Sequence, residues 1–285
     1  TYSDEFQTRF DRKERAGFPL FRDMMATAER RAIAAGIPFY GYTNGDIIFA
    51  EDLTLTLEHI RAAMGAGFFA AHHITKEEHD TTGHKPMMIL GRRTNFQFDT
   101  AHAAADSAGG SEKFHELFDH SKTCAVSHDY LLMARHGELM PEYAVDYFIF
   151  TAGAIDWSTF PEYIVGNVAY DQALIGHARR AGTVVIDATN TIHAFHQTGS
   201  EGNKAGHKRQ AGVKEHNQNL WRQDGFSNGM QDRPAGDDKV LHPHACVDIT
   251  CFTHSTIFTA EYQLAIATKP NDHLSKEQLP DDQAF

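Results

Sequence analysis

The residues that first suggest chemistry are Asn44 and Asp46, which flank Gly45 between two apolar, β-prone runs. These runs predict a strand that arrives, bends at residues 44–46 and leaves as a second strand. In an extended chain, side chains two apart point the same way, so both residues could present oxygens to one hard divalent cation. An Asn-Gly pair between hydrophobic runs is also a strong hairpin signal, and a plain β-hairpin is therefore the alternative interpretation.

Two histidines, His193 and His196, lie three residues apart in a β-prone run that follows residues 183–189. Side chains three apart on a strand point to opposite faces of the sheet, so the two cannot form one His-x-x-His metal site. At most one of them is expected to face a site near Asp46.

Asp171 is expected in the first turn of a helix over about residues 169–180, which carries an apolar stripe and is followed by Gly182. The helix dipole stabilises a carboxylate at that position. The residue is interpreted either as a functional acid or as an ordinary helix-start acid.

Cationic and aromatic candidates follow two predicted strands. Arg92 and Arg93 come after the apolar run at residues 86–91, and ligands of open α/β sheets collect beyond the carboxyl ends of strands. The arginines could therefore hold phosphate oxygens, or they could simply be solvated. Asp156 and Trp157 lie in a polar-aromatic turn, where the indole could offer a flat face to a sugar or pack against the core.

Composition limits the classes of function. The chain has 285 residues, of which 41% are hydrophobic, enough for a substantial core. Its 38 acidic and 26 basic residues give a formal charge of −12 without any basic block, which disfavours nucleic acid and anionic membranes as partners. No run approaches membrane-spanning length and no signal peptide is visible, which leaves the cellular location open.

Helical and β-prone patterns alternate along the chain, and the helices and strands that they predict must position these residues. Apolar spacing predicts helices at residues 18–36 and 51–65, in addition to the one that carries Asp171. The alternation indicates an α/β fold with a mixed, mostly parallel sheet flanked by helices. Residues 1–215 are expected to form this domain, and residues 216–285 a partly irregular C-terminal extension.

Three stretches together resemble one known family: residues 41–48 (Gly-Tyr-Thr-Asn-Gly-Asp-Ile-Ile), 91–95 (Gly-Arg-Arg-Thr-Asn) and 185–189 (Val-Ile-Asp-Ala-Thr) with the region up to 208. On them, the chain resembles glycosyltransferase-like proteins of the nucleotide-diphospho-sugar transferase superfamily, which have the A-type fold. The resemblance implies transfer of a sugar from a nucleotide-diphosphate sugar to a carbohydrate or other hydroxyl acceptor, usually with Mn²⁺ or Mg²⁺. Since only about 45 residues precede Asp46, it also implies a core that lacks part of its N-terminal nucleotide-binding half.

The resemblance assigns roles to individual residues. The Asp-x-Asp metal motif of the family matches Asn44 and Asp46, and a later histidine of the metal shell matches His196. The neutral side chain of Asn44 removes one charge from the site, which implies metal binding that is weaker, water-mediated or absent. The catalytic carboxylate that inverting members of the family place at the start of a helix matches Asp171, whereas in a retaining enzyme Asp171 would need another role.

The same hypothesis assigns binding of the donor phosphates to Arg92, Arg93, Lys204 and Lys208. It assigns binding of the acceptor to Asp156, Trp157 and Tyr170. The sequence therefore leads to a metal-dependent glycosyltransferase. The alternative is a non-catalytic glycosyltransferase-like module that binds a carbohydrate or a protein. A metal-dependent hydrolase is less favoured, because the histidines lack a paired ligand pattern.

Overall fold

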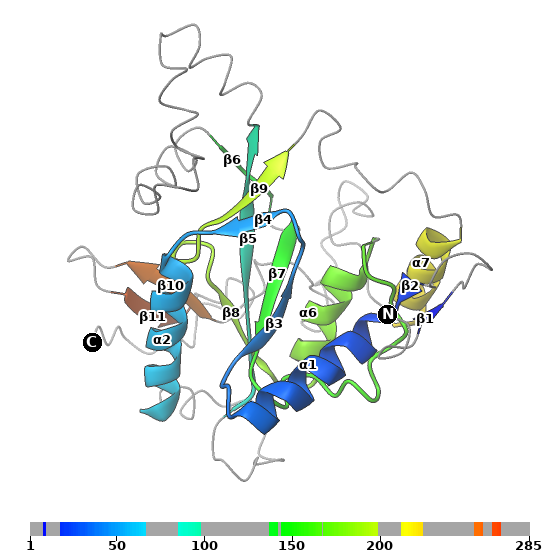
Figure 1. Cartoon of the computed structure of the whole chain (residues 1–285), viewed down its shortest axis with the longest axis horizontal. Helices are drawn as coiled ribbons and strands as arrows, with labels where there is room; N and C mark the ends of the chain where they lie inside the picture. Colours follow the sequence, from blue (N-terminus) through cyan, green and yellow to red (C-terminus); the bar gives the residue numbers. More distant parts are fainter. Residues whose placement is uncertain are drawn as a thin grey trace, which may run out of the picture.

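The structure is a computed structural model that describes residues 8–9, 18–66, 85–97, 137–141, 144–166, 168–198, 212–224, 254–258 and 264–268. Within these residues, one nine-stranded mixed sheet has helices on both faces (Figure 1). This arrangement confirms the mixed α/β fold class. None of the helices described is both long enough and apolar enough to span a membrane.

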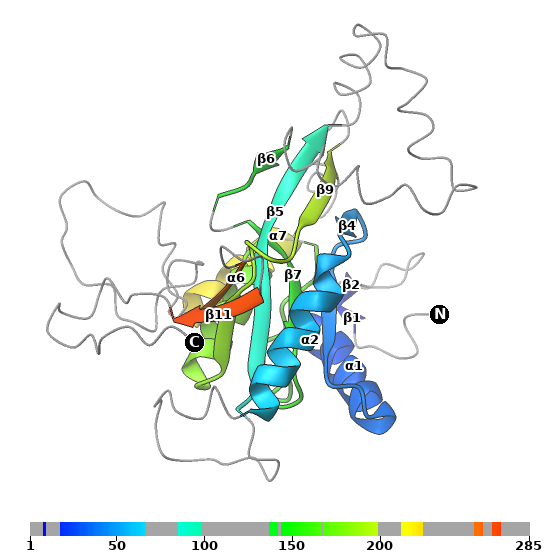
Figure 2. The ribbon, with the colours of Figure 1, turned by 90° about the vertical axis from the view of Figure 1, so that its left-hand side faces the viewer.

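The large sheet is built around β5, its longest strand. Its members are β3 (Tyr40–Thr43), β4 (Ile47–Phe49), β5 (Met87–Gln97), β6 (Glu138–Leu139), β7 (Val145–Phe150), β8 (Val184–Asp187), β9 (Ala194–Thr198), β10 (His254–Phe258) and β11 (Leu264–Thr268). The main order is β11-β10-β8-β5-β7-β3. The first half of β5 pairs with β7 and β8, and its second half continues past them to pair with β6 and β9 (Figure 2).

Strand direction differs from the sequence-based expectation. Five of the eight pairings in the described sheet are antiparallel and three are parallel, so the prediction of a mostly parallel sheet is wrong. The cause is that β7 is covered on both faces and reads as a near-continuous apolar run, the pattern that is typical of parallel strands. Because β7 is buried on both faces, its sequence pattern does not distinguish an antiparallel strand from a parallel one.

Four helices lie within the described residues: α1 (Phe21–Ala35), α2 (Asp52–Gly65), α6 (Tyr170–Arg180) and α7 (Val213–Gln223). Alternate side chains of a strand point to opposite faces. On β5, Met88 and Leu90 join the core shared with α1, α6 and α7, whereas Met87 and Ile89 pack toward α2. Figure 1 shows α2 on one side of the sheet and α1 and α6 on the other. The sheet thus separates two apolar cores.

The first predicted helices are confirmed, with a change at one end. α1 ends at Gly36, whose φ of +64° gives the left-handed conformation that suits glycine. Its predicted start at Phe18 and Pro19 is wrong, because these two residues form β2 (Phe18–Pro19), which pairs with β1 (Thr8–Arg9). α2 buries Ile60 completely, as its apolar stripe predicts.

The C-terminal part contributes more structure than its polar composition predicts. α7 was not expected there, and its Trp221 belongs to the core shared with α1 and α6. β10 pairs with β8, so residues 254–258 extend the same sheet. The sequence pattern also predicts a short helix near residues 114–120 and a β-prone island at 246–252, and both lie outside the described residues. The division of the chain at residue 215 stays a prediction.

Candidate active site

The turn at residues 44–46 carries the chain from one part of the sheet to another. β3 ends at Thr43 and pairs with β7, whereas β4 begins at Ile47 and pairs with β9. The hairpin interpretation is therefore wrong, because β3 and β4 do not pair with each other. Asn44 and Asp46 sit at a turn rather than on an extended strand, and their side chains contact different partners.

Asn44 organises a network of polar side chains. Its Nδ2 donates a hydrogen bond of 2.8 Å to Asp146 Oδ1. Its Oδ1 accepts one of 2.8 Å from the Tyr42 hydroxyl and one of 3.5 Å from the Tyr170 hydroxyl. The carboxamide thus joins β3, β7 and the start of α6, and its oxygen already has two hydrogen-bond donors.

Asp146 is a candidate site residue that the sequence analysis missed. It lies on β7 and accepts a hydrogen bond from Arg93 Nη1 on β5, in an ion pair whose two residues are 8% and 9% exposed. Arg93 Nε also donates to Asn95 Oδ1 at 3.1 Å. The prediction that Arg92 and Arg93 follow the end of a strand is wrong, because β5 continues to Gln97. A lone acid inside the apolar run of β7 was the signal available in the sequence.

Asp171 lies in the first turn of α6, as predicted. Part of the residue reaches the surface, but its carboxyl group is surrounded by protein atoms that exclude water. This loss of solvation raises the pKa of Asp171 from its usual 3.8 to about 7. The backbone N–H of Gln172, 2.9 Å from Oδ1, opposes this effect. The negative charge of Asp146 raises the pKa further, and Arg93 lowers it. Near neutral pH, Asp171 can therefore both accept and release a proton.

Three carboxylates gather around Tyr42. Burial raises the pKa of the Tyr42 hydroxyl, and the charges of Asp146, Asp46 and Asp171 raise it further, so all three lie within electrostatic reach of that group. The ring of Tyr170 meets that of Tyr42 edge-on, with centroids 6.1 Å apart. Tyr42 thus links the predicted metal-binding turn to the predicted base.

Asp46 contacts His196, as the resemblance implies. The Nε2 atom of His196 lies 3.0 Å from Asp46 Oδ2, because His196 is the register partner of Ile47 in the β4–β9 pair. The Asp46 side chain is 53% exposed, whereas that of His196 is 8% exposed. The Nδ1 atom of His196 is buried and has no hydrogen-bond partner among the described residues.

His193 belongs to a different cluster, as the spacing of three residues predicts. Its backbone N–H donates to Asp52 Oδ1 at 3.1 Å, and its Nδ1 contacts Asp52 Oδ2 at the start of α2. The hydrogen bond to Asp52 raises the pKa of His193. His193 and His196 therefore do not share a site.

Fewer side chains than expected are placed to act as ligands of a cation. Among the described residues, no group of three or more His, Cys, Asp or Glu side chains lies close enough to hold a metal ion. Two ligands at right angles, each about 2.1 Å from Mg²⁺, lie about 3.0 Å apart, which is the spacing of Asp46 Oδ2 and His196 Nε2. The same separation is that of an ordinary carboxylate–imidazole hydrogen bond, so the distance is compatible with a cation held by Asp46 and His196 but does not by itself indicate one. Asn44 does not fit as well, because its oxygen accepts from two hydroxyls.

Two predicted acceptor residues have other surroundings. Trp157 is 4% exposed and its indole N–H donates to the Tyr40 hydroxyl at 2.9 Å, so it is a core residue and cannot contact a sugar. Tyr170 is likewise buried. Asp156 is exposed, and its carboxylate accepts hydrogen bonds from the next turn, including one of 2.6 Å from Ser158. The predicted phosphate ligands Lys204 and Lys208 lie outside the described residues.

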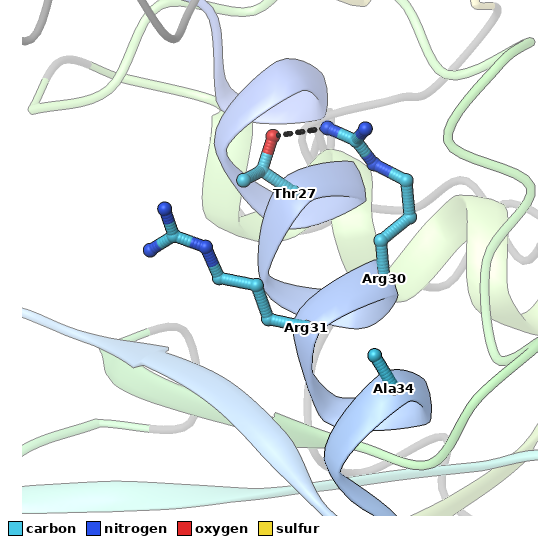
Figure 3. A pocket seen from close by; sticks show the side chains of 4 residues that line it. All are labelled: Thr27, Arg30, Arg31 and Ala34. Atoms are coloured by element: carbon cyan, nitrogen blue, oxygen red, sulfur yellow. Dashed lines mark hydrogen bonds between the residues drawn. The ribbon is translucent and has the colours of Figure 1, made fainter.

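A shallow hollow on α1 does not involve the predicted site. It is lined by Thr27, Arg30, Arg31 and Ala34 (Figure 3). The Arg30 guanidinium donates a hydrogen bond of 2.9 Å to the Thr27 hydroxyl one turn earlier. None of these residues contributes to the network around Asn44.

Comparison with protein-family models, curated proteins and solved structures found no match for this chain. The glycosyltransferase resemblance therefore stays a hypothesis from the sequence. What the structure adds is the cluster of Asp46, Asp146 and Asp171 around Tyr42, with Arg93 and His196 beside it.

Proposed function

We propose that this chain is a glycosyltransferase with an A-type core, which moves a sugar from a nucleotide-diphosphate sugar to a hydroxyl acceptor. The observation that carries the proposal is the position of Asp171 in the first turn of α6, within electrostatic reach of Tyr42 and of the Asp146–Arg93 ion pair. Burial at this position raises the pKa of Asp171 to about 7. A buried carboxyl with such a perturbed pKa, next to a specific charged partner, is typical of a functional site.

Asp171 acts as the general base in this proposal. The acceptor hydroxyl loses its proton as its oxygen bonds to the anomeric carbon, while the bond from that carbon to the departing diphosphate breaks. A base whose pKa lies near the working pH is efficient, because a substantial fraction is ionised before the step and the group still binds the proton firmly enough to accept it. Burial keeps water from the Asp171 carboxyl group, and the charges of Asp146 and Arg93 act on its pKa in opposite directions.

A divalent cation, Mn²⁺ or Mg²⁺, suits the charge of the site. Asp46, Asp146 and Asp171 carry negative charge, and Arg93 is already paired with Asp146, so a bare diphosphate would be repelled. Asp46 and His196 would hold the cation, which supplies positive charge to the diphosphate. Arg92, Lys204 and Lys208 are the proposed further contacts to phosphate. Asn44 acts as an organiser of Tyr42 and Tyr170.

A second candidate function is supported by Asn44 itself. The residue replaces a charged metal ligand of the family pattern, and its oxygen accepts hydrogen bonds from two tyrosines. Both features reduce the affinity for a cation. They favour a non-catalytic glycosyltransferase-like module that binds a carbohydrate or a protein.

Thermal unfolding with a panel of nucleoside diphosphates, with and without Mn²⁺, tests the first proposal. We expect at least one nucleotide to raise the melting temperature only with Mn²⁺, and Asp46→Asn to remove that increase. The exposed Asp156 is the matched control, and Asp156→Asn should keep the increase. Wild-type binding without transfer or donor hydrolysis would support the binding module, and a chain that binds no nucleotide contradicts the glycosyltransferase.

A further inference from the structure

The chain enters α6 through two residues in the left-handed conformation. Gly166 and Ala169 each have a φ of +76°, and Ala169 is the only residue other than glycine with a positive φ in the described part of the chain. Ala169 is also the N-cap of α6, and no side chain caps that end. The conformation crowds the alanine Cβ against the following carbonyl oxygen, so neighbouring contacts must hold it in place.

Asn217 on α7 supplies such contacts. Its side chain is completely buried, and its Oδ1 accepts a hydrogen bond of 3.0 Å from the backbone N–H of Ile164. Its Nδ2 donates to the carbonyl oxygens of Ile164 at 2.9 Å and Val168 at 3.0 Å. One side chain thus fixes the chain on both sides of Gly166, ending one residue before Ala169.

Further contacts hold α7 against the same segment. The Nε2 atom of His216 lies 2.9 Å from the carbonyl oxygen of Glu162, and the Tyr163 hydroxyl donates to Asp224 Oδ2 at 2.7 Å. Val213 packs with Ile164 in a small apolar cluster. The position of Asn217 is therefore well defined relative to the start of α6.

We propose that Asn217 is a positioning residue for the active site: it holds the entry of α6 so that Tyr170 and Asp171 face Asn44 and Asp146. Tyr170 and Asp171 directly follow the left-handed Ala169, so the direction of both side chains depends on this entry. Tyr170 reaches Asn44 Oδ1 with its hydroxyl, at 3.5 Å. The catalytic meaning of this position rests on the proposed function, but the position itself can be measured without any reaction.

A purely structural role for Asn217 makes a different prediction. Loss of its three hydrogen bonds removes Asn217 as a partner of the Ile164 and Val168 backbone groups and lowers stability whichever role applies. Only a positioning role also changes the surroundings of Asp171. The readout must therefore report on the Asp171 carboxyl group itself.

Carbon-13 NMR titration of the Asp171 carboxyl group provides that readout, with the signal assigned by its absence in Asp171→Asn. In Asn217→Ala, we expect the midpoint to move by at least about one pH unit toward the usual value of an aspartate, because solvent gains access to the carboxyl group. Tyr163→Phe is the matched control: it removes one of several contacts that hold α7, but it leaves the three hydrogen bonds of Asn217 and the contacts of His216 and Val213 in place, so its midpoint should stay that of the wild type. An unchanged midpoint in folded Asn217→Ala overturns the proposal.

Ala169→Gly gives a second outcome that can overturn the proposal, even where Asn217→Ala fails to fold. Glycine adopts a φ of +76° without crowding, and the hydrogen bonds of Asn217 remain, so we expect the wild-type midpoint. A large shift in this variant would show that the strained alanine, and not Asn217, orients Asp171. With an active donor and acceptor, Asn217→Ala should lower kcat while KM for the donor is kept. Absence of turnover in the wild type would count against the proposed function alone.

Discussion

Asp171→Asn should make the protein more stable at neutral pH. The native environment raises the pKa of Asp171 to about 7, whereas the unfolded chain keeps the usual 3.8. Between these two values, the unfolded state loses the proton and the native state keeps it, so the free energy of unfolding falls as the pH rises from about 4 to about 7. Asparagine cannot ionise and avoids this loss.

The size of the effect follows from the two pKa values. Their difference of about three units, at 1.36 kcal/mol per unit, gives an upper limit of about 4 kcal/mol above pH 7. The stabilisation should become small near pH 4 and vanish at lower pH, where aspartate is protonated in both states. The asparagine Oδ1 can still accept the hydrogen bond from the backbone N–H of Gln172, so the start of α6 is preserved. The ionised Asp171 carboxylate, which would act as the base, therefore lowers the free energy of unfolding at neutral pH.

Urea unfolding of wild type and Asp171→Asn at pH 4, 6 and 8 measures this dependence. Asp156→Asn is the control of opposite sign, because the Ser158 hydroxyl lowers the pKa of Asp156 and its charge stabilises the fold above that pKa. The control should therefore lose stability at pH 8. If Asp171→Asn has the same effect on the free energy of unfolding at pH 4 and pH 8, the raised pKa is wrong, and Asp171 loses its main support as a base.

Other substitutions test the network and the sheet by urea unfolding at pH 7. Asp146→Ala leaves the buried charge of Arg93 without its partner and should cost about 3 kcal/mol or more, and a loss below about 1 kcal/mol would mean that the ion pair is solvated. Gly91→Ala should destabilise strongly, because its Cβ would lie 2.2 Å from the Tyr147 hydroxyl and 2.9 Å from the backbone nitrogen of Thr189; wild-type stability would contradict this packing. Tyr147→Phe should raise stability by about 1 kcal/mol, since that hydroxyl is buried without a hydrogen-bond partner among the described residues, and a clear loss would reveal a partner.

Local features of this fold could be predicted from the sequence because short-range patterns determine them. The stop of α1 at Gly36, the apolar stripe of α2 and the place of Asp171 in the first turn of α6 all depend on residues within one or two turns. The pairing of Asp46 with His196 was reached through the family resemblance, and the structure brings the two side chains together.

Long-range pairing could not be predicted, because apolar runs do not specify their partners. The Asn-Gly pair at residues 44–45 is typical of a hairpin, but β3 pairs with β7 and β4 pairs with β9, so the two strands do not pair with each other. Asp146 became a site residue only when β7 was placed beside β5 and the entry of α6. Trp157 was predicted to contact an acceptor, but its side chain packs into the core. The sequence pattern of an aromatic turn does not show whether the indole faces solvent or the core.

The pH dependence of sugar transfer is the most direct test of the central claim that Asp171 is the base. With a nucleotide-diphosphate sugar and Mn²⁺, wild-type kcat should rise with pH and level off above about pH 7, as the Asp171 carboxyl group ionises. Asp171→Asn should bind the nucleotide normally and show no turnover above background at any pH. Wild-type turnover in Asp171→Asn, with the same pH profile, would contradict the claim.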